Sequence, residues 1–382
     1  MKKETIIIEP FTRIEGHLRV EIGLKKAQVS SARLSGMMWR GLELILKGKT
    51  PKEATTIVQR ICGVCPVAHA IASSRAVESA YGWAIPPLAQ KVRNILTAVS
   101  TIHDHLVHFY FMSLPDWINP KEIKKANLEK ALYLGLDFYN TSKENLSEEL
   151  KNYMHYFDKL ERTPFFRGPH KEHPALKASP EEGLLLVCHS LKALQVQRLV
   201  NKLINIFGGS SPHVLSITPG GVKIKFEGRG VSFLDQEMFS LAEHLLKEVE
   251  FYLLDYYLKD ALFLGRIYPE WFHIGSGPKN YPLFPEFPKA SLLDTEILPG
   301  GIILEDKVIK IITGVDYSLQ TDLWEDISHS WFADTNDARD PTPCGEVLPP
   351  SFAGERYNYV LAPRYSHQAM EVGSASALLF WL

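Results

Sequence analysis

The stretch EEGLLLVCHSLKALQVQRLVNKLINIFGG, residues 181–209, predicts one long helix that ends at a pair of glycines. Two further segments, residues 87–114 and 232–265, have the same helical character, with apolar side chains recurring every three or four positions in the first. Helices of this length favour a bundle, in which each helix buries one apolar face against its neighbours.

Short β-strands are expected around this bundle. Residues 5–24 alternate apolar and polar side chains and predict two strands near the N-terminus. Residues 284–312 and 346–350 predict further short strands among prolines, and residues 277–300 predict a long ordered loop. We therefore expect a mainly α (α+β) fold, with a long-helix bundle core and small β-sheet elements near the N-terminus and in peripheral segments.

We interpret residues 1–382 as a single domain, because no linker or internal repeat divides the chain. Residues 119–182 are charged and punctuated by prolines, which predicts a peripheral helical excursion within that domain.

The composition excludes several classes of protein. The formal net charge of −2 gives no basic field for nucleic acid. We find no apolar run long enough for a signal peptide or a membrane span. Four cysteines are too few and too scattered for a disulfide framework, so we expect them to serve chemistry rather than stability.

The chemistry is concentrated in RICGVCPVAHA, residues 60–70, which contains Cys62, Cys65 and His69. A redox dithiol of the thioredoxin kind needs a βαβ context, which the helical surroundings do not offer. Structural zinc needs four ligands, and the other two cysteines are distant in sequence. A cysteine pair that runs into a helix also suits a soft transition-metal site, because the positive helix end favours thiolate.

Six segments in order, together with this motif, resemble the large subunit of nickel–iron hydrogenases, and most closely the membrane-associated uptake type. The resemblance runs from residue 5 to about residue 373 and is carried by residues 9–22, 37–69, 103–110, 207–222, 325–332 and 359–373. It covers nearly the whole chain.

The resemblance implies a nickel–iron centre whose iron carries carbon monoxide and cyanide. By position, Cys62 is implied as a terminal nickel ligand and Cys65 as the bridge between the metals. His69 is implied as a hydrogen-bond partner of a cysteine sulfur, and Glu43 as a ligand of Mg²⁺.

The resemblance also implies three catalytic positions. Glu15 is implied as the first proton acceptor, a role that suits a carboxylate whose pKa a dry pocket raises. Arg364 is implied above the open coordination position, held there by Asp104. The residues alone also fit simpler roles: a surface carboxylate for Glu15, and a polar position on a partly exposed helix for Asp104.

The implied activity is reversible heterolytic cleavage of H2, with electrons passed to an iron–sulfur small subunit that alone carries the clusters. Maturation proteins and a membrane cytochrome are implied as further partners. We expect a membrane-associated complex on the periplasmic or outer face, reached through the small subunit, with a cytoplasmic location as the alternative.

The family holds its metals with two cysteine pairs, the second in a D-P-C-x-x-C-x-x-H motif near the C-terminus, and these 382 residues contain no such motif. We therefore expect the domain to be incomplete at its C-terminus, as a truncated, frameshifted or split product. The alternative function is a non-catalytic subunit that acts as a scaffold or assembly element. Of the remaining cysteines, Cys188 is expected in the core and Cys344 in a loop.

Overall fold

The computed structural model describes residues 4–160, 173–224, 234–275, 277–283, 287, 300–312, 323–332 and 354–373. It divides into two compact units, which are described separately: unit 1 is Met1–Lys49 with Gly275–Leu382, and unit 2 is Thr50–Ile274. Whether they act as the single domain expected from the sequence stays a prediction.

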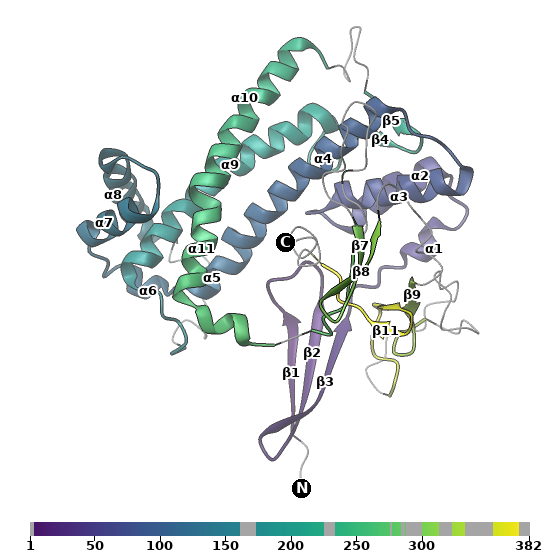
Figure 1. Cartoon of the computed structure of the whole chain (residues 1–382), viewed down its shortest axis with the longest axis horizontal. Coiled ribbons are helices and arrows are strands. Elements are labelled where there is room, and N and C mark those ends of the chain that lie inside the picture. Colours follow the sequence, from purple (N-terminus) through teal and green to yellow (C-terminus); the bar gives the residue numbers. More distant parts are fainter. Residues whose placement is uncertain are drawn as a thin grey trace. The chain divides into compact units, whose positions relative to one another are not determined.

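Unit 2 is helical and contains the predicted long helices (Figure 1). Its helices are α2 (Pro51–Val58), η1 (Gln59–Ile61), α3 (Pro66–Tyr81), α4 (Pro87–Leu106), η2 (Val107–Ser113), α5 (Leu114–Trp117), α6 (Pro120–Ile123), α7 (Leu128–Phe138), α8 (Lys143–Leu160), α9 (Pro180–Gly208), α10 (Gln236–Tyr252), η5 (Leu253–Tyr257), α11 (Leu258–Ile267) and η6 (Pro269–His273). Unit 2 also contains a two-stranded hairpin, formed by β4 (Ile217–Thr218) and β5 (Gly221–Val222).

Helix α9 is the centre of unit 2. It begins with a capping box between Ser179 and Glu182 and ends at Gly208, before Gly209 with a left-handed φ of 75°. Helices α4 and α10 both pack against it, and its inward side chains are buried, Cys188 among them. The prediction of a long helix ended by two glycines is confirmed, as is the core position of Cys188.

The other two predicted long helices are each interrupted by a π-helical segment. The first runs through α4, η2 and α5, and the second through α10, η5 and α11. Such segments hold one residue more per turn, and periodicity alone did not reveal them. Within residues 119–182 the helices α6, α7 and α8 form, and all three pack against α9. The interpretation of this segment as a peripheral excursion stays a prediction.

Where it is described, unit 1 contains three-stranded sheets and the short helix α1 (Leu42–Leu46). The first sheet is an antiparallel meander of β1 (Glu4–Phe11), β2 (Leu18–Lys25) and β3 (Gln28–Gly36). The second is β6 (Tyr281–Leu283), β7 (Gly300–Leu304) and β8 (Lys307–Ile312), and the third is β9 (Leu323–Asp326), β10 (Ala362–Tyr365) and β11 (Gln368–Ala369).

These observations confirm a mixed, helix-rich α+β fold with strands near the N-terminus. Strands β7 and β8 confirm part of the prediction for residues 284–312. Residues 346–350 and most of residues 277–300 lie outside the described residues, as does Cys344.

A buried carboxylate joins the helices of unit 2. Asp260 of α11 accepts hydrogen bonds from the hydroxyls of Tyr110 (2.6 Å) and Tyr139 (2.5 Å), and His189 Nδ1 lies 2.9 Å from its Oδ1. Asp260 and His189 are both completely buried. Burial first, and then the nearby carboxylate of Asp260, raise the pKa of Tyr139 far above its ordinary value.

Replacing Tyr139 with phenylalanine should therefore flatten the alkaline stability profile. Above about pH 10 an unfolded tyrosine ionises while the folded Tyr139 stays protonated, so the wild-type chain loses stability as pH rises. Tyr139→Phe should reduce that slope by up to about 1.4 kcal/mol per pH unit, measured by urea unfolding between about pH 9 and 11. Tyr133→Phe, at an exposed position of α7, is the control, and equal slopes for the wild-type and Tyr139→Phe chains would contradict the prediction.

Candidate functional site

The two motif cysteines lie at the start of α3, where the chain turns from η1 into the helix. Cys62 is buried, and its Sγ accepts hydrogen bonds from the backbone N–H groups of Val64 (3.3 Å) and Cys65 (3.2 Å). Cys65 is the N-cap residue of α3, and Pro66 occupies the first helical position. Two backbone donors and a helix N-terminus stabilise negative charge on sulfur, which suits a metal-binding thiolate.

Neither cysteine forms a disulfide bond within the described ranges, and His69 lies one helical turn beyond Cys65 on α3. Among the described residues no group of three or more His, Cys, Asp or Glu side chains is arranged to hold a metal ion. Cys62 and Cys65 therefore provide two soft ligands, which fits part of a thiolate-bound metal centre.

A buried ion pair holds α3 in place. Arg93 of α4 donates to both carboxylate oxygens of Glu78, at 3.0 and 2.6 Å, and both side chains are at least 95% buried. Arg93 also donates to the carbonyl oxygens of Thr218 (2.8 Å) and Gly221 (3.0 Å), and the N–H of Gly220 donates to Glu78 (2.7 Å). The helix that carries the cysteines is thus fixed to α4 and to the β4–β5 hairpin.

Unit 1 places Glu43 in a partly buried position on α1. Its Oε1 accepts a hydrogen bond from the hydroxyl of Tyr359, whereas its Oε2 is buried and has no hydrogen-bond partner among the described residues. Burial, and then the carboxylate of Glu43, raise the pKa of Tyr359 above its ordinary value. An unpartnered buried carboxylate oxygen is costly, so Glu43 is suited to binding a hard cation such as Mg²⁺.

The contact between Glu43 and Tyr359 brings together two motifs that are far apart in sequence. The N–H of Gly36 donates to Asn358 Oδ1 (2.7 Å), and the N–H of Tyr359 donates to the carbonyl oxygen of Gly36 (3.1 Å). A Cβ atom on Gly36 would lie 2.2 Å from Val360 Cγ2, so only glycine permits this approach.

Arg364 lies on β10, also in unit 1, and is paired with a residue that the sequence did not single out. Its Nε and Nη2 donate to Asp326 Oδ2 of β9, at 3.2 and 3.0 Å. Burial raises the pKa of Asp326, but hydrogen bonds from Ser328 and Arg364 outweigh it, and the net pKa is lowered. Asp326 lies within residues 325–332, one of the segments that carry the family resemblance. That resemblance was the sequence signal that could have identified it.

Asp104, the predicted partner of Arg364, belongs to unit 2. Its Oδ1 lies 3.3 Å from His103 Nδ1, and its side chain is 38% exposed. Arg364 Nη1 has no partner among the described residues, so it is the group available to a second carboxylate. The Arg364–Asp104 pair stays a prediction.

Glu15 lies in the bend between β1 and β2, within unit 1. Its side chain is exposed and forms no hydrogen bond or ion pair with residues in the described ranges. The neighbouring Arg13 and Gly16 have positive φ values of 70° and 94°, so the bend has a defined, turned backbone. The role of Glu15 as a proton acceptor stays a prediction.

Comparisons with known proteins give a consistent result. A family model described as nickel-dependent hydrogenase matches residues 40–382, and a second model described as HoxL-like matches residues 5–35. The Hydrogenase-2 large chain of Escherichia coli K12 is 34% identical over 387 residues, covering 98% of this chain and 67% of the relative. The uptake hydrogenase large subunit of Rhodobacter capsulatus is 32% identical, covering 97% and 67%.

Among solved structures, the Ni-Fe-Se hydrogenase from D. vulgaris Hildenborough in its reduced state matches with a TM-score of 0.75 and 28% identity. That match covers 98% of this chain and 66% of the other chain. The chain thus spans about two thirds of the length of the relatives that it matches. No helix within the described ranges is long and apolar enough to cross a membrane.

Breaking the ion pair beneath α3 should strongly destabilise the protein. Arg93→Met leaves Glu78 as a buried, uncompensated charge, which costs about 3–5 kcal/mol in unfolding free energy. Arg198→Met, at an exposed position of α9, should change it by less than about 0.5 kcal/mol. Chemical denaturation measures both, and a similar small effect for the two variants would contradict a stabilising role for the pair.

Proposed function

Because the chain belongs to the family of nickel-dependent hydrogenases, we propose that it forms the large, catalytic subunit of an enzyme that cleaves H2 heterolytically to protons and electrons. The observation that carries this proposal is the geometry of Cys62, a buried thiol with two backbone N–H donors at the start of a fixed helix. Its relatives are named as hydrogenase large chains, which supports this proposal over the alternative of a non-catalytic scaffold.

Cys62 and Cys65 would hold the nickel–iron centre, Cys62 as a terminal ligand of nickel and Cys65 as the bridge to an iron that carries carbon monoxide and cyanide. When bound, this centre supplies the electrophile needed to split H2. Cys62 and Cys65 would contribute two of the thiolates of this centre, since no group of three or more metal-binding side chains occurs among the described residues. His69 would hydrogen-bond a cysteine sulfur and so tune the basicity of that ligand.

Glu15 would receive the proton at a carboxylate oxygen. Heterolytic cleavage needs a base near the metals, and a carboxylate becomes an effective base once it is shielded from water. Arg364 would remain a cation, since its free pKa is too high for a base at neutral pH, and would act electrostatically. Asp326 on one side and Asp104 on the other would fix the orientation of its guanidinium group.

Glu43 would hold Mg²⁺ through the carboxylate oxygen that has no hydrogen-bond partner among the described residues. The electrons would pass to a small subunit that carries the iron–sulfur clusters, since the two other cysteines, Cys188 and Cys344, are too few for the four ligands of a cluster. We propose a membrane-associated complex on the periplasmic or outer face, with a membrane cytochrome as a further partner and with maturation proteins that insert the metals.

Metal content tests the assignment of the thiolates directly. The full chain, purified anaerobically with its partner subunits, should lose nickel and iron together in Cys62→Ser and in Cys65→Ser. His69→Gln should weaken metal retention by about 10-fold to 100-fold, the usual effect of losing a hydrogen bond to a ligand. Mass spectrometry of the metals gives the readout. Cys188→Ala is the matched control, and retained metal in both serine variants would refute the assignment.

The proton acceptor is tested separately, in protein that keeps its metals. Glu15→Gln removes the base but preserves the shape of the side chain, so H2-dependent dye reduction should fall by about 100-fold to 10,000-fold at unchanged nickel content. Glu4→Gln, at another exposed carboxylate of unit 1, should leave the rate unchanged. A wild-type rate in Glu15→Gln would exclude Glu15 as the acceptor.

A further inference from the structure

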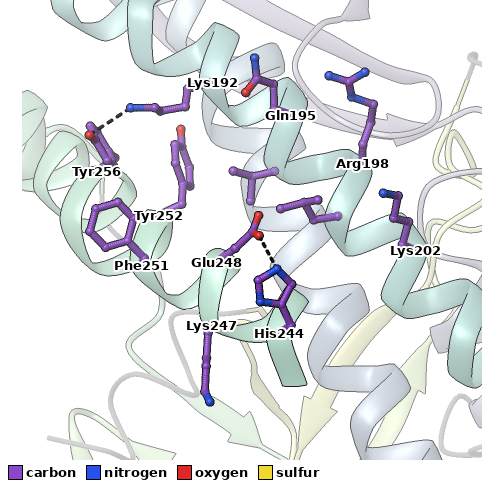
Figure 2. Close-up of a pocket in the computed structure, with 12 residues that line it drawn as sticks. Lys192, Gln195, Arg198, Lys202, His244, Lys247, Glu248, Phe251, Tyr252 and Tyr256 are labelled. Atoms are coloured by element: carbon purple, nitrogen blue, oxygen red, sulfur yellow. Dashed lines mark hydrogen bonds and ion pairs between the residues drawn. The ribbon is translucent and has the colours of Figure 1, made fainter. Parts of the chain in front are cut away.

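An open groove lies along unit 2 between α9 and α10, and it contains none of the residues assigned to the metal centre (Figure 2). It has a volume of about 710 Å³. It extends from Lys192 to Lys202 on α9, which corresponds to about 15 Å at 1.5 Å per residue. We name it the α9–α10 groove. Its length matches about three turns of a helix.

The floor of the α9–α10 groove is apolar. Val196 and Leu199 of α9 face Tyr252 and Phe251 of α10 across it, and Phe251 is 52% exposed. Further along the chain, Leu254 of η5 and Leu258 and Leu262 of α11 are also each about half exposed. Exposed apolar side chains beside an apolar groove are typical of a protein interface.

The rim of the groove is cationic, and two of its cations have no ion-pair partner among the described residues. Lys192 is paired with Glu149 (2.7 Å), and Lys247 is paired with Glu243 (2.9 Å). Arg198 and Lys202, in contrast, form no hydrogen bond or ion pair with any residue in the part of the chain that the structure describes.

Arg198 and Lys202 are exposed and lie one turn apart on α9 (Figure 2). Like charges at this spacing repel, so an anionic partner would relieve a real cost. Glu248 across the groove lies 3.0 Å from His244 Nε2 and forms no ion pair with Arg198 or Lys202 in the described part of the chain.

We propose that the α9–α10 groove binds an acidic amphipathic helix from a partner polypeptide. The apolar face of that helix, with side chains at i, i+3 or i+4, and i+7, would lie on Phe251 and the floor. Carboxylates one turn apart on its flank would pair with Arg198 and Lys202. The length of the groove, its apolar floor and its pair of free cations all match this occupant.

A designed peptide provides the probe. It is a fluorescein-labelled helical 14-mer with leucines on one face and two glutamates one turn apart on the flank, added to the full chain. Fluorescence anisotropy should show binding that weakens with salt, and the Arg198→Glu/Lys202→Glu variant should bind at least about tenfold more weakly. A second peptide with lysines in place of the glutamates should prefer that variant over the wild-type chain, because the charges are then reversed on both sides. Phe251→Ala should weaken the binding of each peptide to the chain that the peptide prefers.

The controls separate this occupant from others. Lys130→Glu reverses an exposed charge on α7, outside the groove, and should leave binding unchanged. Equal binding of a scrambled peptide with the same composition would overturn the proposal. So would inorganic pyrophosphate that displaces the peptide and itself binds through Arg198 and Lys202, which would indicate a small-anion site. Self-association of the wild-type chain that Arg198→Glu/Lys202→Glu abolishes would instead identify a second copy as the occupant.

Discussion

The buried pair of Arg93 and Glu78 is the constraint on which the cysteine motif depends. Burying two charges is costly unless most of their donors and acceptors are paired. Here two carbonyl oxygens and one backbone N–H add to the two hydrogen bonds of the pair, and Arg93 Nε alone of the guanidinium nitrogens has no partner among the described residues. The carbonyl groups come from the β4–β5 hairpin, and the carboxylate comes from the far end of α3. The position of the cysteines is therefore set by an interaction at the opposite end of their own helix.

A second buried charge organises the long helices. Asp260 takes hydrogen bonds from a tyrosine of η2 and from one just after α7, and it contacts His189 of α9. Two of these helical stretches carry π-helical segments, η2 with Tyr110 in it and η5 shortly before Asp260. An added residue in a turn rotates the following side chains, which allows Tyr110 to reach the carboxylate while the helix on either side stays packed.

The features that could be predicted from the sequence are those that a local pattern of residues determines. The helix of residues 181–209 has a capping box, a periodic face and a glycine cap, and it forms within one residue of the prediction. The cysteine motif was likewise readable, because its spacing and its entry into a helix are local. Two contacts could not be predicted from the sequence, the pairing of Arg364 with Asp326 and that of Glu43 with Tyr359. The partners lie 38 positions apart in the first and 316 positions apart in the second. Nothing in the local sequence specifies such partners, even though both lay within recognised segments.

The two halves of the proposed chemistry share one physical feature, an incomplete set of ligands. Cys62 and Cys65 provide two thiol groups, and Glu43 provides one buried oxygen that has no hydrogen-bond partner in the described part of the chain. A buried carboxylate oxygen is rarely left unsatisfied, and a preorganised pair of thiolates has little structural value by itself. Each arrangement is accounted for if a metal ion and further ligands complete it. The Arg93–Glu78 pair fixes the helix that carries the cysteines, and the Gly36–Asn358 contact fixes the chain next to Tyr359. Both contacts therefore support the proposal that Cys62, Cys65 and Glu43 are held ready for metal.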